Sequence, residues 1–526
     1  MYIFNDAKLT TQDIYEIVYR KRKVKVDDSS TSRVQQSFEF LLAYAKENLV
    51  YGVNTGFGPM AQYMVPREES RQLQFNLIRS HAAGSGEILS PNLTRTILLA
   101  RLNTLAQGYS GINPKTIELL SEFLNHEIYP VIYAHGGVGA SGDLVQLSHV
   151  ALALIGEGKV WYEGKIRATE EVLKTLNIQP LAIDLREGLA LINGTAAMNG
   201  IGFANYFAAK KLVDWVLVFS SMLYEILGVF NDFYSTNLND AKQHWGQSQI
   251  ARKLINRLAG SQRVKSRAGN YEFLENQQDA VLKSKMQEYY SIRCVPQILG
   301  PIFDTLRDCE RTLINEINSV SDNPIIDFEA EEVFHGGNFH GDYVSFEMDK
   351  LKLAMIKLSV LVERQLNYLF NDKLNGILPP FINQGILGLN LGLQGTQFTA
   401  TSTVAENRAL GGSLYINSIP TNNDNQDVVS MGSNAAMMTQ KVIHNTYEVL
   451  AVYTQAIVHA IDYLKIGDEL VEPNKKVYRE LKQFIPDWEK DIPYDEILRK
   501  IKNYLWTAQR THQPDQPRAE RKATFS

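Results

Sequence analysis

The stretch LKLAMIKLSVLVERQLNYLF, residues 351–370, decides the fold. Its apolar residues recur every three or four positions, at Leu351, Met355, Leu358, Val362, Leu366 and Leu369. This spacing is typical of one face of an α-helix. A second stripe of this kind runs through 441–464, and 201–230 is a third long apolar segment. Long helices with apolar stripes predict a mainly α-helical protein built on a helix bundle, and they disfavour an α/β sheet.

Loops rich in glycine, asparagine and proline connect the long helices. Loops of this kind on a rigid frame commonly carry function, and here they are 51–60, 135–143, 192–195, 321–324, 335–342 and 418–427. We expect residues 1–200 to form an N-terminal segment that carries the first three loops, and 201–506 to form a central and C-terminal helical bundle. The polar tail 507–526 is expected to be disordered.

Composition excludes several classes of protein. The 526 residues carry a net charge of −5, and nothing global indicates binding to nucleic acid or to an anionic membrane. Charged residues interrupt 201–230, so we expect no membrane span. The two cysteines exclude a disulfide scaffold and a cysteine-based zinc site. No signal peptide is evident at the N-terminus, and we expect a cytoplasmic protein.

The loop HGGVGASGDLVQLSH, residues 135–149, admits more than one interpretation. Gly137, Gly139 and Gly142 match the G-x-G-x-x-G fingerprint of a dinucleotide-binding turn. That turn needs strands alternating with helices, and the long helical stripes leave no room for such a sheet. The serine-hydrolase elbow G-x-S-x-G also fails, because Asp143 stands where its second glycine belongs.

The tripeptide Ala140-Ser141-Gly142 has a chemistry of its own. Attack of the Gly142 nitrogen on the Ala140 carbonyl carbon closes a five-membered ring. Loss of two waters, one of them from the Ser141 side chain, leaves a 4-methylidene-imidazol-5-one, which is an electrophile. Gly142 has no Cβ to obstruct the attack, and a helix beginning near Asp143 would favour electron flow into the ring. From this stretch alone, an ordinary glycine-rich helix entry is an equal alternative.

Six motifs together resemble one known family, the aromatic amino acid ammonia-lyases and aminomutases. They are YGVNTGFG (51–58), GVGASGDL (137–144), INGT (192–195), YYSIRCVPQ (289–297), SDNP with HGGNFHGD (321–324 and 335–342) and NQDVVSMG (425–432). The resemblance covers the chain from about residue 10 to about residue 500. It implies a homotetramer of the fumarase/aspartase-like superfamily, with active sites shared by three subunits. It also implies cyclisation of residues 140–142, with no metal and no external cofactor.

The resemblance assigns roles to single residues. Tyr51 is similar to the base that removes the substrate β-proton, and Arg293 to the clamp on the substrate carboxylate, a geometry that suits arginine. Five others match hydrogen-bonding or pocket positions: Asn193, Tyr290, Asn323, Phe339 and Gln426. A packed tyrosine, a structural ion pair and ordinary loop hydrogen bonds are the alternatives. Asp143 either assists ring formation or caps its own helix.

Several residues bear on the choice of substrate. Ser80 and His81 match the pair that contacts the substrate ring, and Ser-His accompanies histidine in the family. Glu406 resembles the acid that binds imidazole in histidine lyases. Against this, 136–149 and 418–432 resemble Bacteroidetes-type tyrosine ammonia-lyases, which also carry Ser-His. We expect conversion of L-tyrosine to trans-p-coumarate and ammonia. The alternatives are L-histidine to urocanate, or a 2,3-aminomutase. A scaffold protein that has lost its chemistry is disfavoured, because Tyr51, Ser141 and Arg293 are all present.

Overall fold

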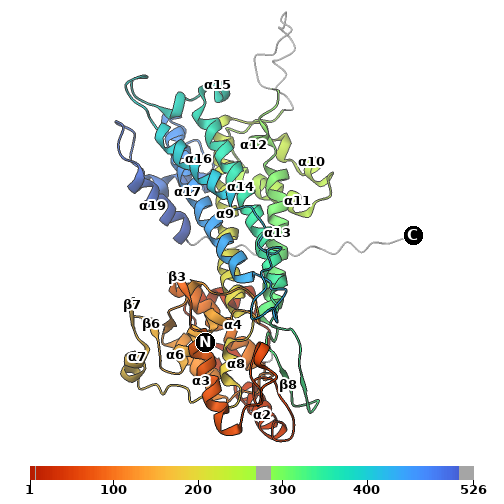
Figure 1. The fold of residues 1–526 in the computed structure, drawn as a ribbon. Coiled ribbons are helices and arrows are strands. Elements are labelled where there is room, and N and C mark those ends of the chain that lie inside the picture. The colour runs from red at the N-terminus through yellow and green to blue at the C-terminus, as the bar shows by residue number, and fades with distance from the viewer. Residues whose placement is uncertain (6, 268–285, 509–526) are drawn as a thin grey trace, which may run out of the picture.

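A computed structural model describes residues 1–5, 7–267 and 286–508. A long helical bundle stands on a lower body of shorter helices and small sheets, and bundle helices run through the waist between them (Figure 1). The main bundle helices are α9 (Ala196–Leu227), α11 (Trp245–Leu258), α13 (Val295–Ile317), α14 (Asp342–Phe370), α16 (Gln394–Ala409) and α17 (Gly432–Leu464). The predicted mainly α-helical bundle is therefore confirmed.

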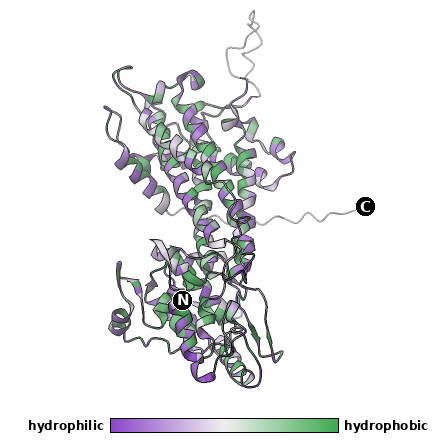
Figure 2. Cartoon of the chain, viewed as in Figure 1, coloured by the Kyte–Doolittle hydropathy of each residue, from purple (hydrophilic) through white to green (hydrophobic). Residues whose placement is uncertain are grey.

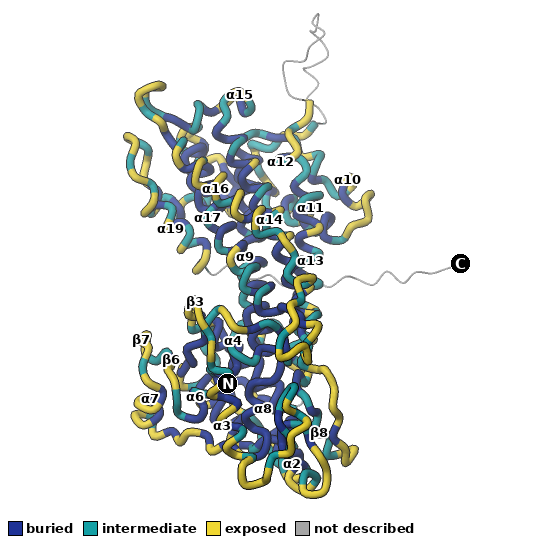
Figure 3. Tube along the Cα trace, viewed as in Figure 1, coloured by how far each residue is buried: buried dark blue, intermediate teal, exposed yellow. Residues whose placement is uncertain are grey.

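The apolar stripes form the inside of the bundle. All six stripe residues of 351–370 have 0% exposed surface in α14. The residues of the second stripe, Ile443, Tyr447, Leu450, Ile457 and Ile461, are at most 1% exposed in α17. α14 and α17 pack along each other, and both contact α9. In Figures 2 and 3, hydrophobic and buried residues follow the interior of the bundle, and hydrophilic and exposed residues lie mostly on its outside and in its loops. The third predicted helix begins earlier than its apolar run, at Ala196, and ends before Gly228, which has a left-handed φ of 62°.

Shorter helices pack against the main helices of the bundle. They are α10 (Thr236–Asp240), α12 (Tyr290–Arg293), α15 (Asp372–Asn375), α18 (Glu472–Lys482) and α19 (Asp495–Thr507). Thr507, which we predicted to lie in the tail, is the last residue of α19. The rest of the predicted tail lies outside the described residues from 509 onward. Within the described ranges, no helix is both long and apolar enough to cross a membrane.

The lower body holds the first eight helices. They are α1 (Thr11–Tyr19), α2 (Asp28–Tyr44), α3 (Ser70–His81), α4 (Pro91–Ala106), α5 (Lys115–Asn125), α6 (Leu144–Leu154), α7 (Thr169–Leu176) and α8 (Glu187–Ile192). Its strands are short: β1 (Tyr2–Phe4), β2 (Val24–Val26), β3 (Ser85–Ile88), β4 (Tyr129–Pro130), β5 (Tyr133–His135), β6 (Lys159–Tyr162) and β7 (Lys165–Ala168). In the described chain the largest sheet is β4-β6-β7, which is antiparallel. A dinucleotide-binding fold is excluded.

Two segments from beyond residue 200 return to the lower body. β8 (Ile325–Asp327) and β9 (Glu332–Phe334) form a hairpin beside α2, and the Ile326 amide donates to the Tyr109 carbonyl (2.9 Å). The loop that precedes α17 reaches Ser141 through Gln426. The division at residue 200 stays a prediction, and the two sides of it share one functional region.

Candidate active site

A cavity of about 630 Å³ opens beside the Ala-Ser-Gly tripeptide. It gathers nine of the residues singled out from the sequence: Tyr51, Ser80, His81, Ala140, Ser141, Asn193, Asn323, Phe339 and Gln426. They come from α3, from the loop before α6, from the end of α8, and from the segments 51–60, 321–341 and 418–431. Segments far apart in sequence therefore converge on the tripeptide.

The backbone around the tripeptide turns tightly. Gly139 and Gly142 pair across the turn, Ser141 has a φ of 58° and Gly142 a φ of 77°. A Cβ on Gly142 would lie 2.1 Å from the Gly194 carbonyl oxygen. Only glycine fits this position, because the backbone of Gly194 occupies the space and the left-handed φ is costly for other residues.

The surroundings of Ser141 fit the methylidene-imidazolone ring. Its hydroxyl accepts a hydrogen bond from Gln426 Nε2 (3.0 Å) and lines the cavity, so the group that must leave is accessible. The Ser141 carbonyl accepts from the Gly194 amide (3.2 Å). Helix α6 begins at Leu144, so the positive end of its dipole lies next to the ring position.

Asp143 occupies the N-cap position of α6, but its side chain makes no capping hydrogen bond there, so the prediction that its carboxylate caps this helix was wrong. Its carboxylate instead accepts from the Met198 amide in the first turn of α9 (2.7 Å) and from the Ser433 hydroxyl of α17. It therefore ties α6, α9 and α17 together beneath the tripeptide. Complete burial raises the pKa of Asp143 to about 6, against the lowering effect of these hydrogen bonds. A part for Asp143 in ring formation stays a prediction.

Tyr51 is held through both its side chain and its backbone. Its phenol oxygen accepts from the Gly58 amide (2.9 Å), and its own amide donates to His335 Nε2 (3.3 Å). Gly52 follows with a φ of 72°, and a Cβ there would meet both Leu189 and Phe57 at 2.7 Å. The loop thus presents the phenol to the cavity in one arrangement.

A buried ion pair supports Asn193. Arg186 and Asp322 are both fully buried and lie 2.9 Å apart. Asn193 Nδ2 donates to Asp322 Oδ1 (3.0 Å) and to the Asn323 carbonyl (2.9 Å). Its Oδ1 is buried at the cavity with no partner among the described residues. An unsatisfied buried acceptor costs about 1–3 kcal/mol, so this oxygen is suited to receive a donor from a bound molecule.

The hydrogen bonds of His81 define its tautomer. Nδ1 lies 3.0 Å from the Leu77 carbonyl oxygen and 3.1 Å from Ser80 Oγ. A carbonyl oxygen only accepts, so Nδ1 carries the hydrogen. In the neutral ring Nε2 is then an acceptor, and it belongs to a residue that lines the cavity.

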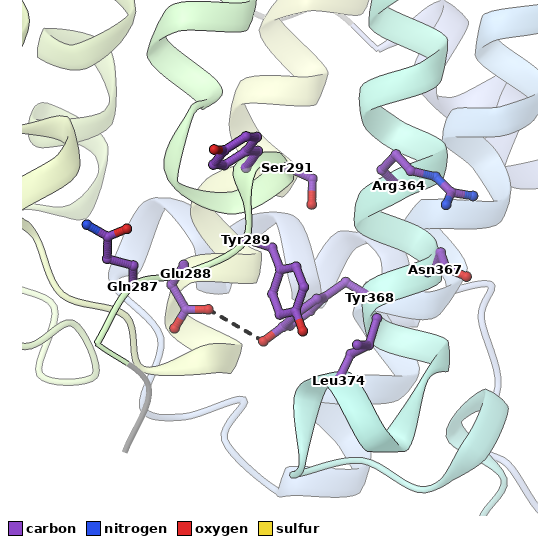
Figure 4. Close-up of a pocket in the computed structure, with 9 residues that line it drawn as sticks. Gln287, Glu288, Tyr289, Ser291, Arg364, Asn367, Tyr368 and Leu374 are labelled. Carbon is purple, nitrogen blue, oxygen red and sulfur yellow. Dashed lines mark hydrogen bonds between the residues drawn. The ribbon is translucent and has the colours of Figure 1, made fainter. Parts of the chain in front are cut away.

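Tyr290, Arg293 and Glu406 lie elsewhere in the chain, in the upper part of the bundle. Arg293 donates to Gln287, and its guanidinium lies 4.9 Å from the centre of the Tyr290 ring. Tyr290 lines a separate cavity of about 720 Å³ between the start of α12 and α14. Figure 4 shows this second cavity, with the Tyr368 hydroxyl directed at Glu288. Glu406 of α16 accepts from Asn445 Nδ2 (2.7 Å).

Two residues of the site, His335 and Gly194, were not predicted from the sequence. HGGNFHGD contains two histidines, and nothing in the pattern distinguishes the one that contacts Tyr51. The INGT motif contains Gly194, but its role depends on a close approach to Gly142 that only the fold creates.

Comparison with known proteins gives a consistent result. The family profile described as "Aromatic amino acid lyase" matches residues 9–483. The chain is 37% identical to the tyrosine 2,3-aminomutase of Chondromyces crocatus over 95% of each protein. It is 38% identical to the tyrosine ammonia-lyase of Cupriavidus metallidurans over 91% of each. The structure of the phenylalanine aminomutase of Pantoea agglomerans superimposes with a TM-score of 0.92 at 32% identity, covering 97% of this chain and 99% of that one.

Proposed function

Since the chain belongs to the aromatic amino acid lyase family, we propose that it converts L-tyrosine to trans-p-coumarate and ammonia. The family includes both ammonia-lyases and aminomutases. Its members share the fumarase-like, mainly helical fold that the sequence predicted. The substrate and the fate of the ammonia are the parts that we propose.

The tripeptide and the proposed base lie on the same cavity. The family depends on a 4-methylidene-imidazol-5-one, here from Ala140, Ser141 and Gly142, which supplies an electrophile for the substrate amine without a metal or an external cofactor. We propose that the Tyr51 phenol takes the β-proton, because it faces the same cavity as Ser141 and is fixed by Gly58 and His335. Fixed placement of reacting groups can supply much of the rate acceleration.

The observation that carries the substrate proposal is the contact between His81 Nδ1 and the Leu77 carbonyl oxygen (3.0 Å). With Nδ1 donating to the Leu77 carbonyl, Nε2 accepts, and the hydroxyl of tyrosine is a matching donor. Phenylalanine has no such donor and would leave the acceptor unpaired. Histidine also carries a ring N–H, so L-histidine to urocanate is the second candidate, supported by the Ser80–His81 pair itself.

We propose that the enzyme is a homotetramer in which three subunits complete each site. One chain does not bring Tyr290, Arg293 or Glu406 to the cavity, so their roles on the substrate require a neighbouring subunit. The bundle also exposes large apolar side chains, among them Tyr343 (79%), Ile416 (75%) and Phe398 (65%). Exposed apolar surface of this kind marks interaction sites. Arg293 of a neighbour would then bind the substrate carboxylate in place of Gln287.

A substrate panel tests the proposal. Purified enzyme receives L-tyrosine, L-phenylalanine or L-histidine, and the products are separated and identified by mass. We expect p-coumarate and ammonia in equal amounts from tyrosine. Urocanate formed only from histidine would overturn the substrate. β-Tyrosine as the main product would identify an aminomutase, the activity that the Chondromyces crocatus relative is named for.

A further inference from the structure

We infer that His335 is a positioning residue that holds Tyr51 for proton removal by acting as a neutral hydrogen-bond acceptor. The inference rests on the proposed role of Tyr51 as base. The contact is the bond from the Tyr51 amide to His335 Nε2 (3.3 Å). His335 and Tyr51 are 284 positions apart in the sequence, so this bond joins two separate loops of the site.

The other bonds to this loop come from nearby in the sequence. Gly58 binds the phenol oxygen, and Gln74 Nε2 donates to the Gly52 carbonyl (3.0 Å). These bonds fix the loop within the N-terminal segment. His335 instead fixes the Tyr51 backbone relative to the loop that carries Phe339, so it sets where the base lies across the cavity.

His335 is itself well anchored. It directly follows β9, which pairs with β8. The next residue, Gly336, donates its amide to Asn323 Oδ1 (2.7 Å). The Asn323 carbonyl accepts from Asn193 Nδ2 (2.9 Å). A continuous set of bonds therefore runs from Asn193, on the tripeptide side of the cavity, to the backbone of Tyr51.

The contact needs an unprotonated Nε2, because an imidazolium ring has only donors. His335 is exposed in the single chain, but partial desolvation, and then the nearby charge of Arg186, lower its pKa and so favour the neutral ring. Asp322 is paired with Arg186 (2.9 Å), and Glu332 on the adjoining strand accepts from the Tyr44 hydroxyl (3.0 Å). Lowering the pH through the pKa of His335 protonates Nε2 and removes the acceptor.

His335→Leu and His335→Gln test the inference, since a glutamine carbonyl oxygen can accept the same bond. We expect His335→Leu to lower kcat roughly 10- to 100-fold, because small misplacements of a catalytic group cost that much, with KM changed less than about threefold. His335→Gln should recover kcat to within about threefold of wild type. In the wild type, we expect kcat to fall at low pH as His335 is protonated, which gives the pH–rate profile an acid limb. His335→Gln should lose this acid limb, because glutamine does not titrate.

His149→Leu is the matched control. His149 Nε2 also accepts a backbone amide, that of Gly84 (3.1 Å), but Gly84 does not line the cavity as Tyr51 does. We expect His149→Leu to keep kcat within about threefold of wild type. Wild-type kcat with an unchanged acid limb in His335→Leu would overturn the inference. If that variant fails to fold, an unchanged acid limb in His335→Gln overturns it instead. Wild-type activity in Tyr51→Phe would refute the proposed base, which is a separate failure.

Discussion

Gly142→Ala is the most informative single change in the tripeptide. The new Cβ would lie 2.1 Å from the Gly194 carbonyl oxygen and 2.3 Å from its carbon. Both are rigid backbone atoms, so the clash is relieved only by moving the main chain. The left-handed φ of 77° adds about 1–2 kcal/mol for a residue with a side chain, and overpacking adds typically 1–3 kcal/mol. We expect the free energy of unfolding to fall by roughly 2–5 kcal/mol.

Gly164→Ala separates the cost of the left-handed φ from the cost of the steric clash. Gly164 has nearly the same φ, 74°, but nothing lies within 4 Å of a Cβ there. We expect it to lose only the conformational part, about 1–2 kcal/mol. Denaturant unfolding of both variants gives the difference, and the intact mass shows whether two waters have been lost. A Gly142→Ala protein as stable as Gly164→Ala, and dehydrated like wild type, would refute the reasoning.

Three further predictions concern charge and specificity. The pKa of Asp143 is raised from 3.8 to about 6, so the folded state favours its protonated form. The free energy of unfolding should therefore fall by about 3 kcal/mol as the pH rises through this interval, and denaturation of Asp143→Asn should lack that slope. Arg186→Met should lower this free energy by about 3–5 kcal/mol by leaving Asp322 unpaired. Arg79→Met, which breaks an exposed ion pair, should change the free energy of unfolding by less than about 1 kcal/mol. His81→Leu should lower kcat/KM for tyrosine relative to phenylalanine by roughly tenfold or more, and equal losses on both substrates would contradict the orientation assigned to His81.

The long helices could be predicted from the sequence because a helix face that packs in the interior carries apolar residues at the helical period. The stripe from Leu351 to Leu369 repeats with the helical period, and every one of its residues is buried. The start of α9 was missed because its first turn, Ala196 to Gly200, consists of small and polar residues apart from Met198, and their burial depends on neighbouring elements. The short helices and strands of the lower body follow from such tertiary contacts.

Those residues of the candidate site could be predicted whose role is indicated by the short motif in which they lie. The tripeptide, Tyr51 and Asn193 lie in motifs whose composition already indicates a turn or a loop, and the fold brings them to one cavity. The partner of Asp143 was not predictable, because Met198 and Ser433 approach it only after α9 and α17 have packed. The position of Arg293 could not follow from one chain, because its proposed place in the site belongs to the assembly.

The mass of the peptide that contains residues 140–142 tests the central claim most directly. Digestion of active wild-type protein should release this peptide lighter than its sequence by two water molecules. The Ser141→Ala protein should fold, lack activity and lack the two-water loss, because no hydroxyl is available to leave. An active wild-type enzyme whose peptide has its full, unmodified mass would contradict the account.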